Sequence, residues 1–112
     1  MPYIKIRTNK KIDDEIASNI KTKLGTDISI LGKSEDWLMV DIENANNLYF
    51  RGEKTDIAYI EVKLFGRCDA SHYNTMTREI TNNINTNLGI NPNNIYVSYF
   101  ETTNWGWNGN NF

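Results

Sequence analysis

Apolar residues along this chain follow two periods, and the change between them occurs twice in the same order. Residues 2–7 alternate between apolar and polar side chains, which is typical of a half-buried strand. Ile12, Ile16, Ile20 and Leu24 then recur every fourth residue, which predicts an amphipathic helix. Further strands are predicted at residues 37–42, 57–65 and 95–100, and a second helix at residues 73–88.

Acidic residues and glycines mark the ends of the predicted helices. The acidic run 13–15 suits a helix N-terminus, because the helix dipole stabilises negative charge there. Gly25 is expected to end the first helix and Gly89 the second, as glycine commonly does. The strand that follows the first helix, beginning at Trp37, is expected to be mostly buried.

The repeated strand–helix–strand order predicts an α+β fold. Two right-handed crossover units of about 50 residues each would build a four-stranded mixed sheet with both helices on one face. The other face would remain uncovered, and we expect its side chains to be substantially apolar. Such a face needs a partner, so the pattern favours oligomerisation.

Length and composition narrow the class of protein. The 112 residues are enough for one domain, 1–112, and too few for two. A net charge of −2 argues against binding to nucleic acid or to an anionic membrane surface. No apolar run approaches the ~20 residues that cross a bilayer, and we expect no signal peptide. With Cys68 as the single cysteine, an internal disulfide is excluded and a cytoplasmic location is expected, with leaderless secretion left open.

The dipeptide Met1-Pro2 carries the first candidate chemistry. Methionine is normally removed before a residue as small as proline, which would leave a secondary amine at the start of a strand. An α-amino group has a pKa of roughly 7.7–8.0 in water. An apolar pocket or a nearby cation lowers this pKa, so that the amine can act as a general base at neutral pH.

Six short segments occur in an order that resembles a known family. They are Met1-Pro2, Leu31-Gly32-Lys33 with Trp37, residues 47–52, Phe65-Gly66-Arg67, residues 95–100, and residues 104–108 with Phe112. Together they resemble the macrophage migration inhibitory factor family of the tautomerase superfamily, over nearly the whole chain. The resemblance implies a homotrimer with active sites between subunits, and keto–enol tautomerisation of phenylpyruvate-like α-keto acids without metal or organic cofactor.

The same resemblance assigns roles to individual residues. Pro2 would be the proton-transferring base, Lys33 and the backbone N–H of Phe65 would bind the substrate carboxylate, and a neighbouring subunit would contribute Tyr96. Further residues would line the pocket: Trp37, Trp105, Trp107 and Phe112. From chemistry alone, Lys33 would also lower the pKa of a nearby amine, and the tryptophans would exclude water.

Several positions depart from the pattern of the animal members of that family. Ser98 replaces an asparagine that touches the substrate's phenol end, and Lys63 with Leu64 replaces a His-Ser pair near the pocket mouth. Ile57 and Ile60 replace a Cys-x-x-Cys pair, so we expect no thiol redox activity of that kind. The C-terminal loop is two residues shorter before Trp105, which changes the entrance.

Other interpretations of single residues and of the whole chain stay open. Cys68 lies near a predicted helix N-terminus, which lowers thiol pKa values, but without a second cysteine we interpret it as a bystander. A hydratase or decarboxylase activity would need an acid or arginine pair near Pro2. A cytokine-like protein would bind a host receptor through an outer surface and keep only a vestigial pocket. An RNA-binding sheet displaying Tyr96 and Phe100 is disfavoured by the net charge.

Overall fold

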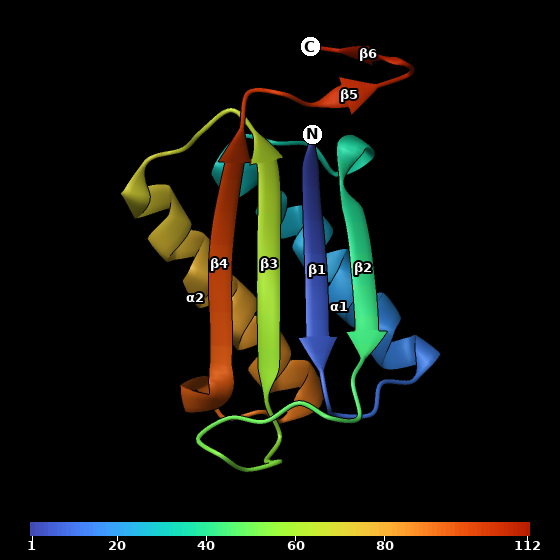
Figure 1. Cartoon of the computed structure of the whole chain (residues 1–112), viewed down its shortest axis with the longest axis vertical. Coiled ribbons are helices and arrows are strands. Elements are labelled where there is room, and N and C mark those ends of the chain that lie inside the picture. Colours follow the sequence, from blue (N-terminus) through green and yellow to red (C-terminus); the bar gives the residue numbers. More distant parts are fainter.

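The computed structural model describes residues 1–112 and confirms the doubled strand–helix–strand order (Figure 1). A small two-stranded hairpin at the C-terminus is added to the predicted elements. The helices and strands are β1 (Pro2–Thr8), α1 (Asp14–Asp27), β2 (Met39–Asn44), β3 (Ala58–Phe65), α2 (Ala70–Leu88), β4 (Ile95–Thr102), β5 (Gly106–Trp107) and β6 (Asn110–Asn111).

The four long strands form one mixed sheet in the order β2-β1-β3-β4. Each strand–helix–strand unit supplies a parallel pair, and the two units join through the antiparallel pair β1 and β3. Both helices lie on the same face of the sheet, as predicted (Figure 1). This arrangement brings the start of β1 beside the ends of β3 and β4, because Pro2 pairs with Leu64 and Phe65 pairs with Thr102.

The core lies between the two helices and the sheet face that they cover. Alternate residues of β1 and β3 point into it, and one stripe of each helix packs against them. Each fully buried aliphatic side chain contributes about 1.5–3 kcal/mol to folding. The fully buried side chains include Ile4, Ile6, Ile20, Leu24, Ile60, Val62, Ile80 and Ile84.

Neither helix is long and apolar enough to cross a membrane.

The two predicted helix ends have different outcomes. Gly89 follows α2 with a left-handed backbone (φ 68°), and its N–H bonds to the carbonyl of Asn85, so that prediction is confirmed. The prediction for Gly25 is wrong, because α1 continues to Asp27. An ion pair between Lys23 and Asp27 (2.7 Å) stabilises the additional turn. A 3-10 turn follows α1, and the left-handed residue is Gly32 (φ 71°).

The uncovered face of the sheet is less apolar than the sequence pattern indicated. It combines aromatic side chains with charged ones. Lys5 and Arg7 both form ion pairs with Glu43, and the Tyr3 hydroxyl donates a hydrogen bond to Asp41 (2.6 Å). The face therefore carries polar networks as well as exposed aromatic rings, of which Tyr96 and Phe100 are examples.

The predicted strand 37–42 is shifted along the chain and is less buried than expected. Trp37 belongs to a 3-10 turn (Glu35–Trp37), and β2 begins two residues later at Met39. Because β2 is an edge strand, none of its residues is fully enclosed. The side chain of Met39 is 65% exposed, so the prediction of a mostly buried strand is wrong.

Candidate active site

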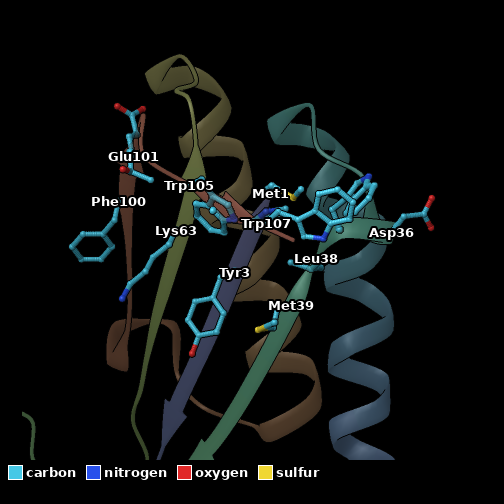
Figure 2. A pocket seen from close by; sticks show the side chains of 14 residues that line it. Met1, Tyr3, Asp36, Leu38, Met39, Lys63, Phe100, Glu101, Trp105 and Trp107 are labelled. Atoms are coloured by element: carbon cyan, nitrogen blue, oxygen red, sulfur yellow. The ribbon is translucent and has the colours of Figure 1, made fainter. Parts of the chain in front are cut away.

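A cavity of about 890 Å³ lies at the end of the sheet where β1 begins and β3 and β4 end (Figure 2). The turn before β2 forms one wall, and the segment that leads into β5 covers the cavity from another side. Of the ten residues that the sequence predicted for the site, five line this cavity: Pro2, Trp37, Lys63, Trp105 and Trp107.

Pro2 is buried at the first position of β1, between Met1 at the surface and the core residue Ile4. A proline fits the first residue of a strand, since it has no N–H to give to the ladder. The preceding carbonyl, that of Met1, accepts a hydrogen bond from the backbone N–H of Phe65 (3.2 Å). Met1 therefore occupies the donor that the family resemblance assigns to the substrate carboxylate.

The terminal amine lies in an environment that favours its neutral form. Partial burial lowers the pKa of the Met1 amine below its ordinary value, and the positive charge of Lys33 lowers this pKa further. Both causes are the ones expected from the sequence. They belong to the location rather than to methionine, so they would act on a Pro2 amine exposed at the same place.

Lys33 reaches this location from the turn that follows α1. Gly32 reverses the chain direction with its left-handed backbone, and Lys33 comes directly after it. The ammonium group of Lys33 donates to the backbone carbonyl of Phe65 (2.9 Å). The Lys33 side chain and the N–H of Phe65 thus meet at the end of β3, beside the start of β1.

The C-terminal hairpin contributes the aromatic part of the site. Trp107 packs edge-on against Trp37, with ring centroids 5.2 Å apart, and Phe112 lies against Phe65 at 5.4 Å. Such pairs stabilise a contact by ~0.5–1.5 kcal/mol beyond the buried area. Together with Met1, these four rings form a second, wholly apolar hollow of about 360 Å³ that adjoins the main cavity. Trp37 is 50% exposed, so it belongs to the rim of the site rather than to the core.

Two predicted residues, Tyr96 and Ser98, lie elsewhere on the same chain. Tyr96 is near the start of β4, at the opposite end of the sheet from Pro2, where its ring contacts Phe50 (5.1 Å). Ser98 shares a hydrogen bond with the hydroxyl of Tyr59 (2.6 Å). A single subunit therefore does not bring these two side chains to the cavity.

Several residues that line the cavity had not been selected from the sequence. Tyr3, Met39 and Phe100 cover the sheet face just beyond Pro2, and Figure 2 shows their side chains on the same side as Lys63. The available signal was the strand alternation: Tyr3, Met39, Lys63 and Phe100 occupy one row across the four strands. This row required the strand register, which the sequence pattern alone did not specify.

A hydrogen-bond network connects α2 and β4 to the turn that carries Lys33. The Tyr73 hydroxyl donates to Glu101 (2.5 Å) and accepts from the N–H of Cys68 (3.2 Å). The Cys68 thiol donates to the carbonyl of Leu31 (3.2 Å), in the turn that carries Lys33. Burial raises the pKa of the Cys68 thiol, so the lowered pKa considered from its helix position is wrong. No three His, Cys, Asp or Glu side chains gather closely enough to form a metal site.

Comparisons with known proteins agree on one family. The family model described as macrophage migration inhibitory factor (MIF) matches residues 1–112. The crystal structure of Leishmania major MIF2 is 32% identical, with a TM-score of 0.93, and the match covers 100% of this chain and 97% of that chain. The MIF homologue of Prochlorococcus marinus is 27% identical, with a TM-score of 0.89 and 98% of both chains covered. No curated protein sequence matches this chain.

Proposed function

Because this chain belongs to the macrophage migration inhibitory factor family, we propose that it is a cofactor-independent keto–enol tautomerase. Its substrates would be phenylpyruvate-like α-keto acids, and Pro2 would transfer the proton after Met1 has been removed. The observation that carries this proposal is the meeting of the chain start, Lys33 and the end of β3 at one edge of an aromatic cavity.

Removal of Met1 would supply two catalytic features at once. It exposes the Pro2 nitrogen as a secondary amine, and it frees the Phe65 N–H that now donates to the Met1 carbonyl (3.2 Å). The freed N–H and the ammonium of Lys33, which bonds to the carbonyl of the same residue at 2.9 Å, would then hold the substrate carboxylate. A charge-assisted hydrogen bond of this kind is about twice as strong as a neutral one.

The proton transfer follows from the state of the amine. The neutral Pro2 nitrogen accepts a proton from the carbon next to the substrate carbonyl, and the electron pair of the C–H bond forms the carbon–carbon double bond. The carbonyl electrons move to the oxygen, and the protonated Pro2 nitrogen gives its proton to that oxygen, which forms the enol hydroxyl and restores the neutral amine. Ketonisation runs through the same steps in reverse. Lys33 stabilises the negative charge, and the aromatic walls exclude water.

We also propose that the enzyme is a homotrimer with its sites between subunits. Tyr96 and Ser98 lie on β4 away from the Pro2 of their own chain, and β4 is a sheet edge that a neighbouring copy can approach. Tyr96 is 60% exposed, so its side chain is available to a neighbouring copy. A neighbour's Tyr96 and Ser98 would complete the cavity around the distal end of the substrate.

The rival enzyme activities need an acid that positions water next to the amine. Asp36 and Glu101 both border the cavity, but Figure 2 shows their carboxylates directed away from it. The Glu101 carboxylate also accepts a hydrogen bond from the Tyr73 hydroxyl (2.5 Å). These placements favour tautomerisation over hydration or decarboxylation. A cytokine-like role through an outer surface is a second candidate, which follows from the family itself.

The decisive experiment measures phenylpyruvate tautomerisation with a chain whose N-terminus has been identified by mass spectrometry. We expect activity only when Pro2 is the first residue, and an ascending limb of kcat/KM below the pH at which a free amine titrates. Pro2→Gly should reduce kcat/KM strongly, because glycine supplies a primary amine without the ring that fixes its position.

The matched control is Pro92→Gly, since Pro92 is the only other proline and lies in a turn before β4, outside the cavity. This variant should keep wild-type activity. Equal activity of the wild type and Pro2→Gly, or full activity with Met1 attached, would refute the amine as the base. Binding of α-keto acids without turnover would favour the signalling role instead.

A further inference from the structure

We propose that Lys63 forms a second anion subsite, so that the preferred substrate is an aromatic α-keto acid with a carboxylate at the far end of its ring. This inference rests on the proposed function, because it assigns the α-carboxylate to Lys33 and the Phe65 N–H. It concerns the cavity on the sheet face beyond Pro2, whose lining includes Lys63, whereas Lys33 and Phe65 lie at its edge.

The ammonium group of Lys63 has hydrogen-bonding capacity that the protein does not use. It makes no hydrogen bond, and its one ion pair, with Glu61, is loose at 3.7 Å. Lys33, by contrast, bonds to the Phe65 carbonyl at 2.9 Å, and Lys23 bonds to both oxygens of Asp27 at 2.7 Å. Lys63 can therefore offer its N–H groups to a ligand without breaking a short internal contact.

Aromatic rings surround this ammonium group. The Lys63 nitrogen lies 5.7 Å from the ring centre of Phe100 and 6.0 Å from that of Tyr3. The Tyr3 hydroxyl is already committed to Asp41 (2.6 Å). The rings favour a cation without providing an acceptor for its hydrogens, and they offer flat surfaces against which an aryl group can pack.

The charge balance of the cavity lining also favours an anion at this location. Lys63 is the only cationic side chain among the residues that line the cavity. The two acidic ones, Asp36 and Glu101, point away from it (Figure 2). A ligand carboxylate here would thus meet one partly free cation, and the acid that it would have to compete with is Glu61, whose contact with Lys63 is loose at 3.7 Å.

The direction of the Lys63 side chain suits a second carboxylate away from the chain start. Lys63 pairs with Tyr3 across neighbouring strands, which lie about 4.8 Å apart, and Tyr3 follows Pro2 directly. Figure 2 shows the Lys63 side chain extended away from the tryptophans, along the sheet face. Its ammonium therefore faces the part of the cavity beyond Tyr3 and not the end of β3, where Lys33 bonds to the Phe65 carbonyl (2.9 Å). A substrate held by its α-carboxylate at Lys33 would reach Lys63 only with a group that extends along the sheet face, as a carboxylate on the far end of an aryl ring does.

Binding can be measured separately from turnover, because all three tryptophans of the chain line the cavity. Two unreactive probes, 4-carboxycinnamate and cinnamate, would be titrated while tryptophan fluorescence is followed, using the processed full chain. We expect the wild type to bind 4-carboxycinnamate about 1.5- to 5-fold more tightly than cinnamate, the range for a half-exposed ion pair. Lys63→Met should abolish this preference and change cinnamate binding by less than about twofold.

The control is Lys21→Met, an exposed lysine on α1 outside the cavity, which should behave as the wild type. The second measurement is the ratio of kcat/KM for 4-carboxyphenylpyruvate and phenylpyruvate, which should fall in Lys63→Met alone. An equal loss for both probes, or no preference in the wild type, would overturn the subsite. A probe preference that depends on Lys63 in a protein without turnover would support the subsite and count against the tautomerase.

Discussion

Replacing Lys33 with methionine removes one positive charge from the inner end of the site and keeps a side chain of similar length. The variant loses the hydrogen bond from the ammonium to the carbonyl of Phe65 (2.9 Å) and, in the proposed mechanism, the charge that pairs with the substrate carboxylate. It also removes one of the two causes that lower the pKa of the terminal amine.

The expected magnitude follows from the lost charge-assisted bond. A hydrogen bond to a charged group contributes ~1.5–3 kcal/mol, and each ~1.4 kcal/mol changes a rate ratio tenfold. We therefore expect kcat/KM for phenylpyruvate to fall about 10- to 150-fold in Lys33→Met. The sign of the pH effect is also fixed: without Lys33 the pKa of the amine rises, so the ascending limb moves to higher pH. Burial, the larger cause, remains and keeps the limb below that of a free amine.

The assay is a pH–rate profile of kcat/KM for the processed wild type, Lys33→Met and a control, Lys11→Met. Lys11 is exposed and lies outside the cavity, so its profile should match the wild type. Thermal unfolding of all three proteins separates a loss of activity from a loss of fold. An unchanged kcat/KM in Lys33→Met, or a limb that moves to lower pH, would refute the assigned role of Lys33.

Three further variants test the fold and the supporting network. Ile60→Ala opens a cavity in the fully buried core and should lower the free energy of unfolding in urea by ~2–5 kcal/mol, which a loss below 1 kcal/mol would contradict. Gly89→Ala places a side chain on a left-handed residue (φ 68°), and calorimetry should show a loss of ~1–2 kcal/mol. Burial and the bond to Glu101 raise the pKa of Tyr73 to about 12, as the bond to Asp41 does for Tyr3, so Tyr73→Phe should lower the absorbance change near this pH by one tyrosine. The variant should also lower kcat/KM for phenylpyruvate modestly, because it removes the network that connects to the turn of Lys33 but leaves Pro2 unchanged. An unaltered kcat/KM would argue that the network does not support Lys33.

Most of the fold could be predicted because apolar period and chain order determine it together. The doubled strand–helix–strand pattern specified the mixed sheet and the single covered face, and Gly89 ended its helix as expected. Gly25 misled the prediction, because a glycine inside a helix and one after it look alike in sequence. There the Lys23–Asp27 pair and the following 3-10 turn decided where the helix ends.

Part of the cavity lining could be predicted from the sequence. Pro2 and the tryptophans were selected because their residue types are unusual at those positions, and the structure places them around one cavity. The row that contains Tyr3, Met39 and Phe100 was missed, because it exists only once the strand register is known. Tyr96 and Ser98 could not be assigned a place from one chain, since the residues around them in a trimer would belong to another copy.

The burial of Pro2 in a central strand has a consequence for the order of events during biosynthesis. The strand that encloses it, β3, is made some sixty residues later, so the first residues of a growing chain stay accessible to an aminopeptidase. Once β1 lies between β2 and β3, Met1 is tied to Phe65 and the scissile peptide bond is sheltered. The proposed function therefore requires that Met1 is removed before β1 is enclosed, and a chain that folds with Met1 in place would keep its amine blocked.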